Sequence, residues 1–318
     1  MKISGFTIIR NAVKYDFPAV ECITSVLDLV DEFVVALGDS SDNTEELINA
    51  INSPKIKIIK TNWDTNTYYK DGQIYAHQTD IALRACKGDW CFYLQADEVL
   101  HEDGIPIIRA ACEKYLDDKN ADGFLLNYVW LYGNYNKYID SMHIAYPKEV
   151  RIVRNRPDIH SWRDAQSFRI IPDFDYKDFY QKENTSKLRC IDLNAWLFHY
   201  TYVRDPRVLV KKKTEQISLH AGENVSELVQ YYDYGNLSVF PDFKGTHPAV
   251  MKQRMRELSW GHLLKFTGEP PQIFGHKRKL KYRILNFVEN KILGGRLLFG
   301  WKNHITVGRF GWNRQAKK

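Results

Sequence analysis

Apolar runs alternate with helix-like patterns along the first 130 residues of the chain. Short runs rich in Ile, Val, Phe and Leu predict strands, and apolar residues at three- and four-residue spacing predict helices. This alternation is typical of βα units and of an α/β fold with a mostly parallel sheet flanked by helices. The strands are expected at 3–9, 33–37, 56–60, 90–95 and 123–131, and the helices at 17–30, 45–51, 73–86 and 105–116.

The pattern loosens beyond residue 132 into short strands, aromatic loops and further helices. Pro270-Pro271 marks a break. We therefore expect a βα half over 1–132, a mixed region of the same domain over 133–268, and a basic, helical C-terminal extension over 269–318. The later strands are expected at 132–138, 149–154, 167–171 and 195–203, and the later helices at 207–220, 225–232 and 250–266.

Composition is that of an ordinary globular protein, with 44% hydrophobic and 26% charged residues among 318. No apolar run approaches the roughly 18 to 20 residues of a membrane-spanning helix, and the chain shows no signal-peptide pattern. A cytoplasmic location is therefore the default expectation. The five cysteines form no CxxC pair, which favours small core residues over a disulfide framework or a zinc site.

Charge is distributed unevenly along the chain. Residues 276–318 contain twelve Lys or Arg and one acid, Glu289, although the whole chain carries only +6. Leu280, Ile284 and Phe287 are interleaved with these basic residues in an amphipathic helical pattern. Such a pattern suits an anionic membrane surface, where it could associate with the inner face of the cytoplasmic membrane. Docking of the segment on the protein's own core is the alternative, and we expect no nucleic-acid partner.

Polar side chains gather where the first four predicted strands end. Carboxyl ends of parallel strands share one edge of a sheet, where open α/β sheets bind ligands. The apolar run 90–95 ends at Gln95, and the carboxylates of Asp97 and Glu98 follow it. This strand end is therefore a candidate site for a metal ion or a diphosphate. Helix capping is the structural alternative for these acids and for the loop 38–44. The other strand-end residues are Arg10, Asn11, Asp39, Ser41, Asp42 and Trp63.

The segments 33–44 and 85–98 resemble the nucleotide loop and the DxD-bearing strand of family 2 glycosyltransferases with the GT-A fold. A weaker match covers 197–206. The resemblance implies an inverting enzyme that binds a nucleotide-sugar, with a UDP-sugar favoured, through the strand-end residues named above. The chain departs from the family pattern in two places. Gln95 stands where the first Asp of the motif is expected, and Leu37-Gly38-Asp39 stands where paired acids are common.

The resemblance also implies Mn2+ or Mg2+, held by carboxylates and by the donor's phosphates. Asp97 matches the metal-binding Asp of the motif. His199 is a second candidate ligand for the metal or the diphosphate, although a structural histidine is at least as common in such a place. Asp164 is the candidate catalytic base, with a salt bridge to a neighbouring arginine as the alternative.

The acceptor is expected to be a glycan or a lipid-linked glycan. Trp162 and Trp130 are candidate platforms for a sugar ring, with ordinary packing as the alternative. A dinucleotide-dependent oxidoreductase and a P-loop NTPase are disfavoured, because neither GxGxxG after the first strand nor GxxxxGK[ST] is present. A nucleotidyltransferase or related metal-dependent phosphate enzyme, and a non-catalytic domain that binds glycans or membranes, are the alternative functions.

Overall fold

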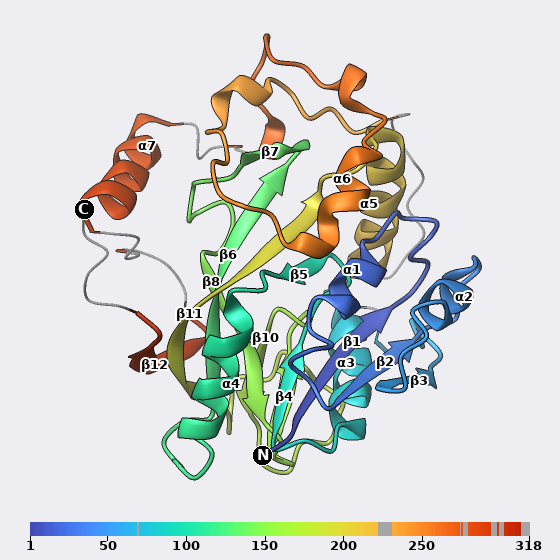
Figure 1. Ribbon diagram of the computed structural model, residues 1–318, viewed down its shortest axis with the longest axis vertical. Helices are drawn as coiled ribbons and strands as arrows, with labels where there is room; N and C mark the ends of the chain where they lie inside the picture. The colour runs from blue at the N-terminus through green and yellow to red at the C-terminus, as the bar shows by residue number, and fades with distance from the viewer. Residues whose placement is uncertain are drawn as a thin grey trace.

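The computed structural model describes residues 1–68, 70–221, 231–273, 275, 279–293, 298 and 302–312. Twelve strands of this part form one sheet, whose main path runs β3-β2-β1-β4-β8-β6-β11-β10-β9 (Figure 1). The strands are β1 Ile3–Ile9, β2 Glu32–Leu37, β3 Ile56–Lys60, β4 Trp90–Tyr93, β5 Glu98–Leu100, β6 Gly123–Tyr132, β7 Asn134–Tyr138, β8 Lys148–Arg154, β9 Ile159–Trp162, β10 Ser167–Ile170, β11 Ser186–Tyr202 and β12 His304–Phe310.

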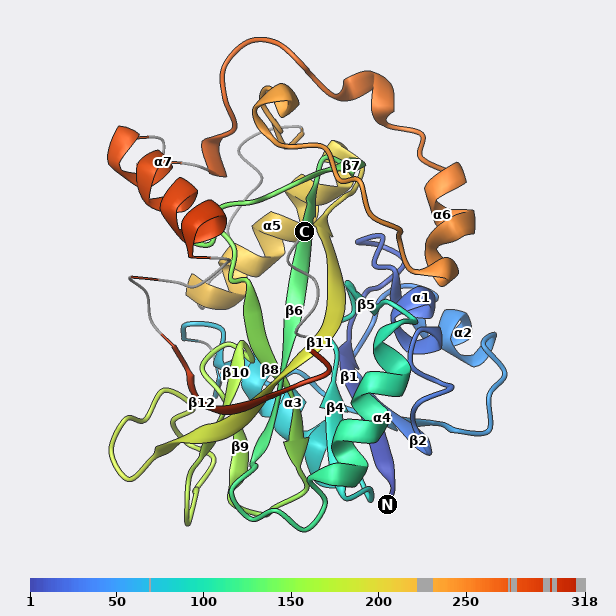
Figure 2. The ribbon, with the colours of Figure 1, turned by 60° about the vertical axis from the view of Figure 1, so that its left-hand side comes forward.

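The sheet is parallel across β3, β2, β1 and β4 and mixed beyond them. The prediction of an α/β fold with a parallel sheet in its first half and a mixed region beyond it is thereby confirmed. Helices lie on both faces of the parallel half (Figures 1 and 2). The helices are α1 Ala19–Thr24, α2 Thr44–Asn49, α3 Gln73–Ala85, α4 Gly104–Lys114, α5 Pro206–Ala221, α6 Lys252–Arg256 and α7 Leu280–Phe287.

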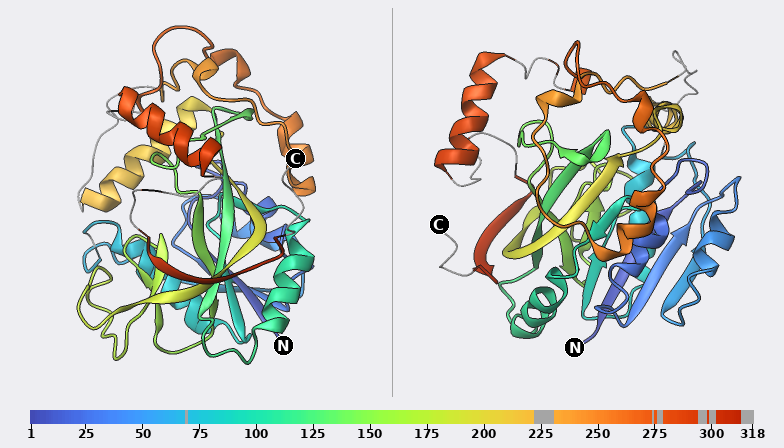
Figure 3. Two further views of the ribbon diagram at one scale, coloured as in Figure 1. Left: turned by 90° about the vertical axis from the view of Figure 1, so that its left-hand side faces the viewer. Right: turned by 45° about the horizontal axis from the view of Figure 1, so that its top comes forward.

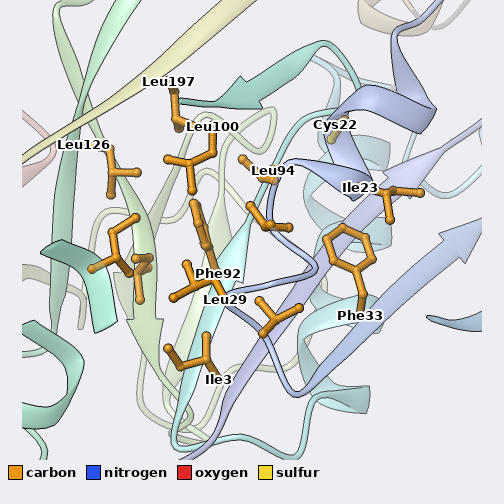
Figure 4. Packing of buried hydrophobic residues seen from close by; sticks show 14 of the residues in the cluster. Ile3, Cys22, Ile23, Leu29, Phe33, Phe92, Leu94, Leu100, Leu126 and Leu197 are labelled. Carbon is orange, nitrogen blue, oxygen red and sulfur yellow. The ribbon is translucent and has the colours of Figure 1, made fainter. Parts of the chain in front are cut away.

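Two apolar layers hold the sheet between its helices. One face of the parallel strands packs against α1 and α4, with Phe33, Phe92 and Leu94 at its centre (Figure 4). On the other face, Phe6 and Tyr93 lie in a cluster with Leu83 of α3. Because every residue of β4 is buried, Trp90–Tyr93 reads as a continuous apolar run in the sequence. All five cysteines are buried and free, as expected.

Several elements differ from their predicted extents. The helix predicted over 17–30 ends at Thr24, where the Thr24 and Ser25 hydroxyl groups donate to the Val20 and Cys22 carbonyls and compete with the helical pattern. The strand predicted over 132–138 is broken by a turn at Gly133, which has a φ of 75°. The prediction over 225–232 lies mostly outside the described residues.

The helical segment predicted over 250–266 is reduced to the short helix α6, Lys252–Arg256. The chain instead forms short turns at Ala249–Met251 and Gly261–Leu263 on either side of α6. Trp260 is buried there and donates its indole N–H to the Gly133 carbonyl at 3.0 Å. That long-range anchor decides the local path of the chain.

The C-terminal segment contributes both a helix and a strand. α7 stands away from the sheet, whereas β12 pairs in parallel with β11 (Figure 3). α7 continues into a single π-helical turn, Val288–Ile292. The helical extension is thus confirmed, and β12 is an addition that the apolar pattern had not predicted.

Candidate active site

The loops that follow β1 and β2 bind each other at the carboxyl edge of the sheet. The side-chain amide oxygen of Asn11 accepts the Ser41 backbone N–H at 2.8 Å, and the Asn11 N–H donates to the Ser40 hydroxyl at 3.0 Å. Asn11 has a φ of 54°, a conformation that asparagine tolerates better than most residues. Asn11 and Ser41 therefore shape this edge by joining its two loops.

Arg10, Asp39 and Trp63 meet beside these loops. Arg10 Nε lies 3.3 Å from Asp39 Oδ1, and the guanidinium carbon of Arg10 lies 5.3 Å from the centre of the Trp63 ring. Trp63 packs directly on Gly38, where a Cβ atom would collide with the indole. Because Gly38 has no side chain, the Trp63 ring can pack where the family pattern has paired acids. The indole nitrogen of Trp63 is buried and has no hydrogen-bond partner among the described residues.

The Asp42 carboxylate accepts hydrogen bonds from the backbone at the start of α2 and from the loop after β1. It accepts the Thr44 N–H at 3.1 Å and the Lys14 N–H at 2.6 Å, and it also accepts the Thr44 hydroxyl. Asp42 therefore has the structural role of holding the backbone at the start of a helix, which was the alternative to ligand binding. Beside it, a hollow of about 350 Å³ is lined by Leu37, Asp39 and Lys60, among others.

Asp97 follows the last residue of β4, Tyr93, by four positions and lies buried between two cationic side chains. Its Oδ2 accepts Lys212 Nζ at 2.8 Å and Arg204 Nη2 at 3.4 Å. Burial raises the pKa of Asp97, but the charges of Lys212 and Arg204 and the hydrogen bond from Lys212 outweigh burial and hold this pKa well below its usual range. Asp97 is accordingly an ionised carboxylate.

Glu98, although adjacent in sequence, is a structural residue. It forms a fully buried, two-bonded ion pair with Arg151, with Nε–Oε2 at 3.0 Å and Nη2–Oε1 at 2.8 Å. Tyr128 and the Gln95 N–H donate to the same carboxylate at 2.7 and 3.1 Å. All of its acceptor positions are therefore directed at the protein.

His199 of β11 reaches the same strand end. Its Nδ1 accepts the Thr201 N–H at 3.3 Å, so the ring proton belongs on Nε2, which then donates to Gln95 Oε1 at 3.2 Å. The ring stacks on Trp130 with 3.9 Å between centres. Burial lowers the pKa of His199 to about 4 despite the nearby Asp97 carboxylate. The histidine is therefore neutral near pH 7.

A divalent metal does not fit these side chains as they are arranged. Among the described residues, no group of three or more His, Cys, Asp or Glu is placed to hold a metal ion. Asp97 is already paired with Lys212 and Arg204, and the Nε2 proton of His199 faces Gln95. A metal ion would have to displace Lys212 and lie close to a second cation.

Asp164 lies in the loop between β9 and β10, with 37% of its side chain exposed. His220 Nε2 of α5 lies 3.8 Å from Asp164 Oδ2, and the interaction with this carboxylate raises the pKa of His220. Tyr75 lies close to both, with its ring centre 5.9 Å from that of His220. Asp164 thus combines solvent access with a neighbouring imidazole.

The two candidate acceptor platforms are engaged in packing. Trp162 is only 1% exposed, and the guanidinium groups of Arg163 and Arg169 each lie 4.2 Å from its ring centre. The prediction that Trp162 receives a sugar ring does not agree with this burial. Trp130 is half-buried, with one ring face covered by His199.

Helix α5 connects the separate parts of this edge (Figures 1 and 2). Lys212 contacts Asp97, Glu215 Oε1 accepts Arg10 Nη1 at 2.9 Å, and His220 lies beside Asp164. None of these helix residues was predicted from the sequence to belong to the site. Lys212 and Asp97 are 115 positions apart, and no local pattern links them.

The family model described as Glycosyl transferase family 2 matches residues 19–174, which include Asp39, Trp63, Asp97 and Asp164. The resemblance found in the sequence is thereby confirmed over this part of the chain. The matched segment ends before His199, Arg204 and Lys212.

Two curated proteins share part of the sequence. A TPR repeat-containing protein of Synechococcus elongatus is 26% identical over 188 residues, or 58% of this chain. The lipopolysaccharide core biosynthesis glycosyltransferase LpsC of Rhizobium meliloti is 29% identical over 117 residues, or 36% of this chain. In both cases the match spans 39% of the relative's length.

Among solved structures, that of S. aureus TarS 1-349 is 15% identical, with 71% of this chain and 67% of that chain covered at a TM-score of 0.39. The glucosyl-3-phosphoglycerate synthase from Mycobacterium tuberculosis, solved with Mn2+, uridine diphosphate and phosphoglyceric acid, is 20% identical at a TM-score of 0.29. It covers 41% of this chain and 43% of its own. These likenesses are too distant to identify a ligand.

Proposed function

Since residues 19–174 form a family 2 glycosyltransferase domain, we propose that this protein transfers a sugar from a nucleoside-diphosphate donor to an acceptor hydroxyl with inversion. The observation that carries the proposal is the convergence of Arg10, Asp39, Trp63 and Asp97 at one edge of the sheet. A ligand that spans this edge can place its nucleoside beside Asp39 and Trp63 and its diphosphate near Asp97. The hollow beside Asp39 lies on the nucleoside side.

The transfer forms a bond between the acceptor oxygen and the anomeric carbon. The bond from that carbon to the diphosphate oxygen breaks, and its electron pair stays on the nucleoside diphosphate. The proton of the acceptor hydroxyl goes to a base, and Asp164 is the proposed base because its carboxylate is partly exposed close to α5. His220 is placed to orient that carboxylate.

The acceptor is proposed to be a glycan or a lipid-linked glycan at an anionic membrane surface. Helix α7 supports this proposal, because Leu280, Ile284 and Phe287 are 68%, 55% and 59% exposed and Lys281 and Arg283 lie among them. In the part of the chain that the structure describes, no helix has the length and apolar character needed to span a bilayer. Sedimentation with anionic and neutral vesicles tests the membrane proposal. Leu280→Glu should abolish pelleting with anionic vesicles, and pelleting that it leaves unchanged would contradict it.

A thermal-shift panel of UDP-, GDP- and dTDP-sugars, followed by turnover of whichever class binds, tests the function. One class should raise the melting temperature, and the product should have the opposite anomeric configuration to the donor. Asp39→Asn should weaken the shift, whereas Asp28→Asn, which changes an exposed carboxylate away from this edge, should not. Absence of any shift in the wild type, or an equal shift in the Asp39 variant, would contradict the proposed site.

A further inference from the structure

The carboxylate that matches the metal-binding position of the family is bound to two cationic side chains. We propose that Lys212 and Arg204 supply the positive charge that the family resemblance assigns to a divalent metal, and that they stabilise the diphosphate leaving group directly. This inference rests on the proposed function. It replaces the expected Mn2+ or Mg2+ with residues of this chain, and it explains why Gln95 can stand where an acid is expected.

The net charge of Asp97, Lys212 and Arg204 equals that of a divalent metal ion bound by one carboxylate. Burial and the neighbouring Arg204 lower the pKa of Lys212 to about 7, whereas its 2.8 Å ion pair with Asp97 favours the protonated form. With Lys212 protonated, Asp97, Lys212 and Arg204 together have a formal charge of +1, which is also the charge of a divalent ion on one carboxylate. Gln95 is neutral, and Glu98 is neutralised by Arg151. A second acid at position 95 would cancel this surplus positive charge, whereas an amide leaves it intact for the diphosphate.

Arg204 has donor capacity that the protein does not use. Its side chain is fully buried, and its Nη1 has no hydrogen-bond partner among the described residues. A buried guanidinium donor without a partner costs free energy unless a ligand binds it. The rest of the group is fixed, because Nε donates to the Asp16 carbonyl at 3.2 Å and the guanidinium lies 4.4 Å from the centre of the Phe17 ring. Guanidinium is also the side chain best suited to phosphate oxygens.

Lys212 is held in place by contacts with Asp97, Thr201 and Phe17. Its Nζ donates to Asp97 Oδ2 at 2.8 Å and to Thr201 Oγ1 at 2.7 Å, and it lies 4.8 Å from the centre of the Phe17 ring. Both cations therefore share the Phe17 ring and one oxygen of Asp97. Such preorganised charge in a dry site is effective in stabilising negative charge that develops on a leaving group.

During transfer the anomeric carbon bond to the diphosphate breaks and the electron pair remains on the phosphate oxygen. Lys212 and Arg204 stabilise that charge through N–H bonds, and no proton needs to leave either group. Asp97 then keeps both cations in position between turnovers, since without it two like charges would lie side by side in a buried site. Asp97 is therefore a positioning residue in this scheme.

The test compares the binding of UDP and GDP by calorimetry in EDTA and in Mn2+, together with turnover of the corresponding nucleotide-sugar. Wild-type protein should bind one nucleotide equally well in both conditions. Lys212→Ala should weaken binding in EDTA by about 10- to 100-fold and kcat by about 100-fold. Lys211→Ala, which removes the same charge from an exposed position of α5, is the matched control and should change neither.

The wild-type comparison remains decisive even if Lys212→Ala fails to fold. Binding or turnover that requires Mn2+ and disappears in EDTA would overturn this inference while leaving the proposed function intact. Binding of no nucleotide in either condition would overturn both. A Lys212→Ala protein that folds and binds as the wild type does in EDTA would also contradict the role assigned to this lysine.

Discussion

Glu98→Gln should destabilise the protein strongly without acting on the chemistry directly. The substitution removes one charge of a fully buried pair and leaves Arg151 uncompensated. Breaking a buried pair in this way costs about 3 to 5 kcal/mol of unfolding free energy. Arg151 would keep its bonds to the Val150 and Gln166 carbonyls at 3.1 and 2.9 Å, but neither carries a charge.

Urea unfolding followed by tryptophan fluorescence measures this cost. The double variant Glu98→Gln with Arg151→Met should regain a large part of the lost stability, because it removes the stranded charge together with its partner. The matched substitution Asp97→Asn should instead reduce turnover. It should also cost stability, because it leaves the buried cations Lys212 and Arg204 without their shared carboxylate, and their remaining acceptors on Thr201 and Asp16 carry no charge.

A stability loss below about 1 kcal/mol for Glu98→Gln would refute the reasoning that this carboxylate is structural. If Glu98→Gln lost activity at unchanged stability, the reasoning would also be refuted, and Glu98 would have a role in the reaction.

Three further changes have defined outcomes. Burial lowers the pKa of His199 to about 4, so between pH 6.5 and pH 4 the unfolded chain binds a proton at this residue that the folded chain does not. The free energy of unfolding should therefore fall by about 3 kcal/mol as the pH drops from about 6.5 to about 4. Urea midpoints across this range should decline less for His199→Gln than for the wild type, and equal slopes would contradict the explanation. Trp162→Ala should lower the free energy of unfolding by about 3 to 5 kcal/mol because it leaves a cavity, and the folded variant should keep its affinity for the donor. Unchanged stability together with a raised KM for the acceptor would instead indicate that Trp162 binds the acceptor sugar. Asp164→Asn should lower kcat by about 10²- to 10⁴-fold with donor binding unchanged, measured by initial rates, and a normal kcat would exclude it as the base.

The parallel half of the fold could be predicted because its signals are local. β1 and β3 begin and end at the predicted residues, since each is a short apolar run between turns. The meeting of Arg10, Asp39 and Trp63 also follows from the rule that parallel strands end at one edge. The short extent of β5 and the pairing of β12 with β11 could not be predicted, because sheet contacts across distant segments decide them.

The cationic part of the site was not predictable for a similar reason. Asp97 and Glu98 look alike in sequence, and only the contacts of Arg151 and Lys212 separate a structural carboxylate from a functional one. Those partners lie 53 and 115 positions away. Arg204 was visible in the weak family match over 197–206, but nothing local indicates that it approaches Asp97.

The most direct test of the account is a crystal structure with the nucleoside diphosphate that binds, grown in the presence of Mn2+. We expect the nucleoside to lie beside Asp39 and Trp63, with diphosphate oxygens within hydrogen-bond distance of Lys212 and Arg204. A Mn2+ ion between Asp97 and the diphosphate would contradict the direct role of the two cations. A nucleotide bound away from this edge of the sheet would contradict the proposed active site.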